Sequence, residues 1–216
     1  MKKLKLNFEK NSIFTSKSDV LKLLKNQIKL SRIEKILDFT VEDWQKNKNK
    51  ILAQIVTDFP NKKVIIRSSA IGEDSAKNSE AGSYESILNI NSNSKAQLIS
   101  AINHVINSYK EKNNLNNNNQ ILVQTQTLEI ITSGVIFTRT SDLASPYYVI
   151  NYEEGKSTVG VTQGSVNETI KISRYSNNKI LTKKWNLLLS AVKEIQSIIS
   201  SDSLDIEFGI TQSNAV

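Results

Sequence analysis

Apolar residues recur at helical spacing in four stretches of the chain. The first covers residues 16–37, where the spacing predicts two short helices. The second begins after Thr40, which together with Asp43 three residues later forms a helix-start signal. Two further helices are predicted from the apolar stripes over residues 98–109 and 185–199.

Short runs rich in β-branched and aromatic residues lie between these stretches and predict strands. The most compact run is Val64-Ile65-Ile66, which follows the turn signal Pro60-Asn61. Further strands are predicted at residues 87–90, 121–123, 134–137, 147–151, 169–173 and 204–210. Helices and strands are therefore mixed along the whole chain.

The amino-acid composition is typical of a folded protein. The chain has 216 residues, of which 38% are hydrophobic and 23% charged, so one large domain or two small subdomains are expected. It lacks cysteine, which excludes disulfides, thiolate zinc sites and cysteine nucleophiles, and it has one histidine, His104, which excludes a His-rich metal site. We find neither a signal peptide nor an apolar run of about 20 residues, and expect a soluble, cytoplasmic protein without a membrane partner.

The basic residues outnumber the acidic ones by 28 to 21, and this net charge of +7 favours anionic partners. No aromatic residues are interleaved with the lysines, so nucleic acid is disfavoured as a partner. Neither GxxxxGK[ST] nor a GxGxxG between a strand and a helix is present. A nucleotide would therefore need a different phosphate clamp.

One candidate clamp lies at the end of the strand over residues 64–66. The strand leads into Arg67-Ser68-Ser69-Ala70, and a small-residue, glycine-containing loop follows up to Glu85. An arginine fixed by a strand can grip phosphate oxygens while backbone N–H groups of the loop close over them. The alternative is a structural ion pair of Arg67 with Glu73 or Glu85.

A second candidate lies on the last predicted strand. Alternation places Asp205 and Glu207 on one face and Ile206 and Phe208 on the other, and two carboxylates on one face suit magnesium. The alternative is a solvated strand face. His104 lies away from the apolar stripe of its helix, and we expect it at the surface.

Six segments in order resemble one known family, the N-terminal ATP-grasp (PEP/pyruvate-binding) domain of phosphoenolpyruvate synthase and pyruvate phosphate dikinase. They are residues 64–74, 81–90, 121–124, 133–139, 161–164 and 205–208. The resemblance covers nearly the whole chain. It implies an α+β, ATP-grasp-like fold with two lobes, approximately residues 1–119 and 120–216, and with the nucleotide in the cleft between them.

The resemblance also implies roles for individual residues. Lys17 and Arg67 match phosphate-contacting, catalytic positions, and Glu207 matches the carboxylate that holds magnesium. The remaining matches to nucleotide-binding positions are the glycine loop Gly82, Ser83 and Tyr84, the adenine-reading segment Gln126 and Thr127, and Arg139.

The implied function is Mg-ATP binding in an ATP-dependent phosphotransferase. The family's domain passes a phosphoryl group to a histidine on a separate swivelling domain, which carries it to pyruvate on a barrel domain. Both are absent here, His104 does not match the phosphohistidine, and Ala215-Val216 resembles an interrupted strand. We therefore expect a fragment that is inactive alone. The alternatives are a dikinase-type enzyme with another acceptor, and a non-catalytic basic binding module.

Three departures from the family pattern predict weakened Mg-ATP binding. The segment Thr15-Ser16-Lys17 lacks the two glycines of the family's lysine loop, so close backbone approach to phosphate is less favoured. The family's Gly-Leu-Gly-Glu is replaced by Glu153-Glu154-Gly155-Lys156 and Val159, so a carboxylate that the family uses there is missing or displaced. The family's metal-binding glutamine and the arginine after it are expected just past Val216.

Overall fold

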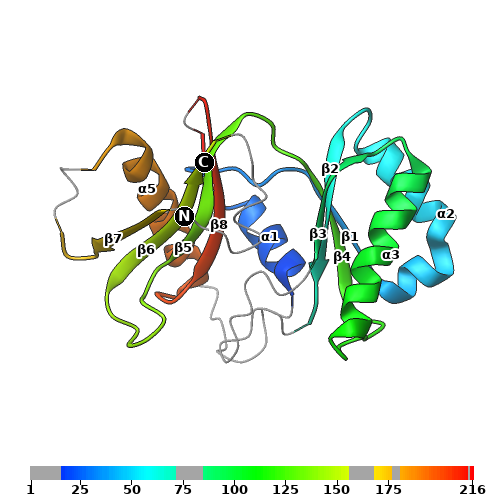
Figure 1. Cartoon of the computed structure of the whole chain (residues 1–216), viewed down its shortest axis with the longest axis horizontal. Coiled ribbons are helices and arrows are strands. Elements are labelled where there is room, and N and C mark those ends of the chain that lie inside the picture. Colours follow the sequence, from blue (N-terminus) through cyan, green and yellow to red (C-terminus); the bar gives the residue numbers. More distant parts are fainter. Residues whose placement is uncertain (1–15, 72–84, 156–167, 177–180, 214) are drawn as a thin grey trace, which may run out of the picture. The chain divides into compact units, whose positions relative to one another are not determined.

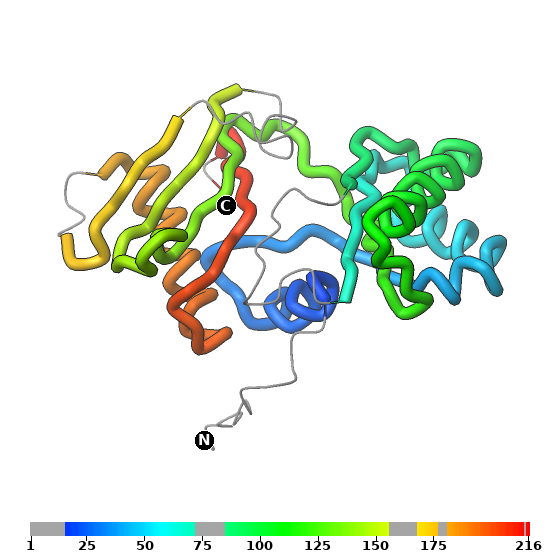
Figure 2. The backbone as a smooth tube through the Cα atoms, turned by 60° about the horizontal axis from the view of Figure 1, so that its bottom comes forward, coloured from blue at the N-terminus to red at the C-terminus, as the bar shows by residue number. Residues whose placement is uncertain are grey.

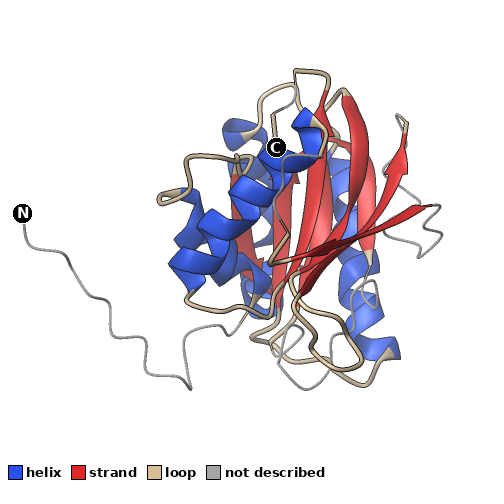
Figure 3. Cartoon of the chain, turned by 90° about the vertical axis from the view of Figure 1, so that its left-hand side faces the viewer, coloured by secondary structure: helices blue, strands red, loops and turns tan. Residues whose placement is uncertain are grey.

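The computed structural model describes residues 16–71, 85–155, 168–176, 181–213 and 215–216. These residues form two compact units, each with one four-stranded sheet and helices (Figures 1 and 3). Unit 1 comprises Met1–Leu23 and Ile36–Thr125, and unit 2 comprises Leu24–Lys35 and Gln126–Val216. The mixed α+β class expected from the sequence is confirmed.

Unit 1 is built on an antiparallel sheet with the strand order β1-β4-β2-β3. Its strands are β1 (Ile36–Thr40), β2 (Lys63–Ser69), β3 (Ser86–Asn91) and β4 (Gln120–Thr125). Helices α2 (Val41–Asp58) and α3 (Lys95–Glu111) cover one face, and the first turns of α1 (Lys17–Lys25) lie on the opposite face (Figure 1).

The apolar stripes of the two covering helices form the core of unit 1. Leu98, Ile102, Val105 and Tyr109 of α3 are fully buried against the sheet, as the sequence predicted. The helix start at Thr40 is also confirmed: Asp43 N donates to Thr40 Oγ1 (3.0 Å), and Thr40 N donates to Asp43 Oδ2 (3.1 Å). This reciprocal capping box satisfies two backbone donors at the start of α2.

One predicted helix is wrong. Apolar residues at 33, 36 and 37 indicated a second helix in the first stretch, but Ile36–Thr40 forms β1. β1 pairs with β4, placing Phe39 opposite Ile121 and Leu37 opposite Val123, so that Phe39 is buried in the core. The distant strand β4 decides the conformation, because pairing and packing outweigh a short helical pattern.

Unit 2 has a second antiparallel sheet, with the order β7-β6-β5-β8. Its strands are β5 (Ile130–Phe137), β6 (Tyr147–Glu154), β7 (Glu168–Ser173) and β8 (Asp205–Thr211). Helix α5 (Lys183–Ile199) packs along one face (Figure 2). The helix buries Trp185, Leu188, Leu189 and Val192 there, which confirms the last predicted helix.

The segment Leu24–Lys35 belongs to unit 2 although it precedes β1. The Glu194 carboxylate of α5 accepts hydrogen bonds from the backbone N–H groups of Lys29 (3.0 Å) and Leu30 (2.9 Å). Arg32 N donates to Val216 O (2.9 Å). These contacts fix the segment on its unit. Among the described helices, none is both long and apolar enough to cross a bilayer.

Candidate functional site

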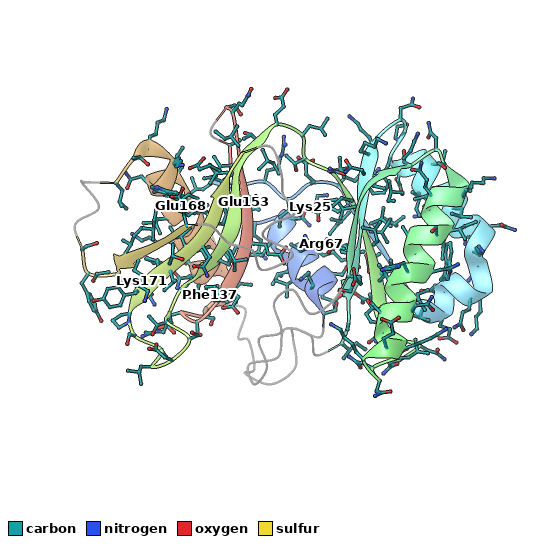
Figure 4. The ribbon with its side chains drawn as sticks, in the orientation of Figure 1. Lys25, Arg67, Phe137, Glu153, Glu168 and Lys171 are labelled. Atoms are coloured by element: carbon teal, nitrogen blue, oxygen red, sulfur yellow. The ribbon has the colours of Figure 1, made fainter. Side chains whose placement is uncertain are left out.

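Arg67 lies on β2, which pairs with strands on both sides. In the register Arg67 stands opposite Leu122 of β4 and Ser86 of β3. Val64 and Ile66 point into the core beneath α2 and α3, so alternation places Arg67 and Ser69 on the opposite face. Arg67 therefore faces the side of the sheet on which α1 lies (Figure 4). Pairing on both sides gives this side chain a rigid base.

The start of α1 is attached to the same face of the sheet. Ser18 N donates to Ser69 Oγ (2.9 Å), and Ser16 Oγ lies 2.8 Å from Gln120 Oε1. Ser69 and Gln120 are direct partners across β2 and β4. Lys17, the first residue of α1, is thus held between two anchored serines.

The structure therefore brings the two predicted cations to one part of unit 1. Ser69 follows Arg67 by two residues on the same face of β2, a separation of about 7 Å along a strand, and Ser69 holds the residue next to Lys17. The sequence did not predict that Ser18 and Ser69 connect α1 to β2. Ser18 directly follows Lys17 in the chain, and Ser69 follows Arg67 by two positions.

The local electrostatics suit an anion. The N-terminus of a helix carries a partial positive charge, which adds to the charges of Lys17 and Arg67. The hydroxyl of Ser18 is fully buried and has no hydrogen-bond partner among the described residues. A buried polar atom left in this state costs free energy that a ligand can recover. Asp19 opposes this effect; its N–H is capped by Ser16 Oγ (3.3 Å).

Farther along this face, α1 also makes an ion pair with the sheet. Lys22 Nζ lies 2.7 Å from Asp38 Oδ2 of β1, and Asp38 stands opposite Leu122 in the register. Arg67, Leu122 and Asp38 thus form one row across three strands. Lys22 is thus engaged with Asp38 of the sheet, and the sequence named Lys17 and Arg67 as the cations of the candidate site.

The other unit 1 candidates are only partly described. Gly82, Ser83 and Tyr84 lie outside the described residues, so the glycine loop stays a prediction. His104 is exposed, as expected, and its Nε2 lies 3.8 Å from Glu85 Oε2. Gln124 lies within the segment 121–124 of the family resemblance, for which the sequence predicted no individual role. Its Oε1 is buried without a partner among the described residues.

Gln126 and Thr127, the expected adenine-reading residues, follow β4 directly. Both are half-buried and belong to unit 2. They lie on the link between β4 and β5 and form no part of either strand. Their role at the adenine stays a prediction.

The carboxylates of β8 are arranged as predicted. Ile206 and Phe208 pack against the core of unit 2, and Asp205 and Glu207 are exposed on the opposite face. Among the residues that the structure describes, no group of three or more Asp, Glu or His side chains is placed to hold a metal. Magnesium is commonly held by one or two protein carboxylates together with phosphate oxygens, so Asp205 and Glu207 fit that ion.

A further carboxylate lies on the same face of this sheet. Glu153 of β6 stands opposite Ser133 of β5, whose Oγ donates to Glu153 Oε1 (3.4 Å). Glu153 is 8% exposed (Figure 4). It shares its face with Glu207, which stands opposite Val135. The sequence noted Glu153 only as a departure from the family pattern. Tyr152 and Glu153 are consecutive residues of β6, so strand alternation could have predicted that Glu153 lies on the face opposite the core.

Arg139 is engaged within unit 2. Its guanidinium pairs with the Asp202 carboxylate and donates to Ala144 O (2.8 Å). The pair raises the pKa of Arg139 and lowers the pKa of Asp202, so both groups are charged at neutral pH. These contacts give Arg139 a structural partner beside its predicted role toward a nucleotide.

Comparison with known proteins decides the family. The sequence model of the family described as pyruvate phosphate dikinase, AMP/ATP-binding domain, matches residues 11–186, which is most of the chain. The chain belongs to this family. The resemblance inferred from the sequence is thereby confirmed, and membership supports nucleotide binding.

Solved structures give more distant likenesses. D-alanine-D-alanine ligase from Helicobacter pylori is 11% identical over 93% of this chain and 48% of its own, with a TM-score of 0.46. D-alanyl-alanine synthetase A from Vibrio cholerae is 14% identical over 84% of this chain and 47% of its own (TM-score 0.39). A dinucleotide-forming acetyl-coenzyme A synthetase 1 from Ca. Korarchaeum cryptofilum, in complex with coenzyme A, Ca-AMPCP and HgCl+, is 12% identical over 77% of this chain and 61% of its own (TM-score 0.37).

The chain thus spans less than two thirds of the length of each of these structures. No curated protein matches the sequence.

Proposed function

We propose that this chain is the Mg-ATP-binding domain of a phosphoenolpyruvate synthase-like phosphotransferase. The observation that carries the proposal is the attachment of α1 to β2, which sets Lys17 beside the strand that bears Arg67. Family membership supports a nucleotide as the anion that they bind. In this proposal Gln126 and Thr127 lie at the adenine.

In the proposed mechanism the chain positions the triphosphate and neutralises its charge. Phosphoryl transfer has a loose transition state with charge spread over the peripheral oxygens, so fixed cations stabilise it without a base. The planar guanidinium of Arg67 binds two phosphate oxygens. Lys17 adds a point charge, and the N-terminus of α1, where Lys17 lies, adds a partial positive charge. Glu207 and Asp205 would hold magnesium, which would supply further neutralisation of the phosphate charge.

The acceptor in this proposal is a histidine on a separate domain, from which the phosphoryl group passes to pyruvate. The chain alone then binds nucleotide without completing the reaction. A longer protein from which this chain derives would carry the histidine domain and a barrel domain, and different neighbouring domains would point to another acceptor.

The test is a nucleotide titration of the chain and two matched pairs of variants. Thermal unfolding with Mg-ATP measures binding, since a ligand at 100 times its Kd stabilises the folded state by about 2.7 kcal/mol. Arg67→Gln removes a charge-assisted contact worth about 1.5–3 kcal/mol, which corresponds to roughly a tenfold to hundredfold rise in Kd. Lys17→Gln is expected to act in the same direction.

The controls are Lys63→Gln at the other end of β2 and Lys25→Gln at the other end of α1, both exposed. They remove the same charge from the same elements and are expected to leave the Kd unchanged. Equal Kd values in Arg67→Gln and Lys63→Gln would remove Arg67 from the site. No stabilisation of the unaltered chain by Mg-ATP would favour a non-catalytic module.

A further inference from the structure

Unit 2 contains a pocket on the side of its sheet that α5 covers. Its volume is ≈ 690 Å³, and it opens at the C-terminal end of α5. The lining residues are Tyr148, Arg174, Lys193, Gln196, Ser197, Ser200, Ser201 and Asp202. Tyr148 points to the α5 side, whereas Asp205 and Glu207 occupy the opposite face, so this pocket is separate from the candidate magnesium carboxylates.

The wall of the pocket is ordered by contacts among its own residues. Arg174 lies over the ring of Tyr148, with 5.5 Å between the guanidinium carbon and the ring centroid, and its Nη1 donates to Asp202 O (3.2 Å). Tyr148 Oη donates to Gln196 Oε1 (3.1 Å). In this arrangement the amide oxygen of Gln196 accepts from the tyrosine, so the amide nitrogen is the donor that this contact leaves unused.

The Gln196 amide leaves a donor unused. Gln196 Nε2 is buried and has no hydrogen-bond partner among the described residues. A buried donor without an acceptor is unfavourable, and it is satisfied when an acceptor atom arrives. The hydroxyl groups of Ser197 and Ser200 add further donors around the same pocket, whereas the Ser201 hydroxyl donates to Ser203 O (3.2 Å).

The charges favour the same kind of ligand. Asp202 is shared between Arg139, with which it is paired, and Arg174, at 3.8 Å. One carboxylate thus meets two guanidinium groups, and the exposed Lys193 adds another positive charge. The carbonyl groups at the end of α5 oppose an anion, but Ser200 N and Ser201 N already donate to Gln196 O.

We propose that this pocket binds an anionic group with several acceptor oxygens, a phosphate or a carboxylate, at a site distinct from the ATP clamp. Lys193 and Arg174 supply charge, Gln196 supplies an amide donor, and the hydroxyls of Ser197 and Ser200 complete the shell. The proposal is independent of the proposed function, because every residue that it uses lies in unit 2 and outside the clamp.

The test is a titration of the isotope-labelled chain with inorganic phosphate and, separately, with citrate, followed by amide NMR at constant ionic strength. Constant ionic strength matters because diffuse attraction to a basic surface is screened by salt. We expect saturable shifts of the amides around Ser197–Ser201 with one of the two probes. Saturation by phosphate alone identifies a phosphate site, and saturation by citrate alone identifies a carboxylate site.

Two variants and one control decide whether the pocket is responsible. Lys193→Gln removes the exposed charge, and Gln196→Glu replaces the amide donor by a carboxylate of the same shape; each is expected to raise the Kd at least about tenfold. Lys183→Gln, at the opposite end of α5, is expected to leave it unchanged. Absent saturation, or an equal loss in Lys183→Gln, would overturn the proposal.

A last variant separates this site from the ATP clamp. Arg67→Gln is expected to leave phosphate binding at the pocket intact even where it abolishes ATP binding. Loss of the phosphate shifts in Arg67→Gln would show that the probe had bound at the clamp, and the pocket proposal would then be withdrawn while the proposed function stood.

Discussion

Tyr109→Phe tests whether the core of unit 1 supports the candidate clamp. Tyr109 is fully buried on α3, and its hydroxyl joins two neighbouring strands: it donates to Gln120 O (2.6 Å) and accepts from Ser69 N (2.9 Å). Ser69 and Gln120 are the residues that hold Ser18 and Ser16 at the start of α1. One hydroxyl thus connects the core helix to the anchor of Lys17.

The expected cost follows from what the variant leaves behind. Phenylalanine keeps the ring and its packing but leaves Ser69 N–H buried without its acceptor, and an unsatisfied buried group costs about 1–3 kcal/mol. Loss of the bond to Gln120 O adds about 0.5–1.5 kcal/mol. We expect unit 1 to lose roughly 1.5–4.5 kcal/mol of unfolding free energy. The Kd for Mg-ATP should rise because Ser69 is no longer fixed.

The assay is urea denaturation of the chain and of Tyr109→Phe, with Tyr147→Phe as the control. Tyr147 is 41% exposed on β6, so loss of its hydroxyl is expected to cost little. The midpoint of the transition that reports unit 1 should fall at an unchanged slope, since the exposed surface stays the same. A loss below about 0.5 kcal/mol, equal to that of a typical surface change, would refute the view that this hydroxyl holds the anchor.

Two further predictions concern single positions. Gly134→Ala is expected to destabilise unit 2 by about 1–3 kcal/mol in thermal or urea unfolding, because a Cβ would lie 2.2 Å from Asn151 O on the paired strand β6; an unchanged midpoint would contradict the tight strand pairing. Bonds from Thr40 lower the pKa of Asp43, so its contribution is present above the unfolded pKa of about 3.9 and is lost as the pH falls through the folded value. Asp43→Asn should therefore flatten the fall in stability below pH about 4, and an identical acid profile would argue against the capping box.

Much of the local structure could be predicted because it depends on short-range patterns. The stripe on α3 predicted a helix whose buried face is the one observed, and the compact run before Arg67 predicted β2. The position of Arg67 near a strand end followed from the same run. These features need only alternation or helical spacing within a dozen residues.

The rest depended on partners far away in the chain. Ile36–Thr40 carries apolar residues that fit a helix as well as a strand, and the choice is made by pairing with Gln120–Thr125. No pattern in either segment encodes that register, since it depends on which strands are adjacent in the folded sheet. The helix was therefore predicted wrongly where the tertiary contact was decisive.

The same distinction explains what the sequence could say of the clamp. It named Lys17 and Arg67 separately, 50 positions apart, and could justify each only by its own surroundings. Their association rests on the bond between Ser18 and Ser69 and on the pairing of Ser69 with Gln120, both of which require the folded sheet. If the anchor positions Lys17, Ser69→Ala, which retains Arg67, should weaken Mg-ATP binding in the same direction as Lys17→Gln, whereas a charge that acted only through the overall positive field would be indifferent to the loss of a neutral hydroxyl.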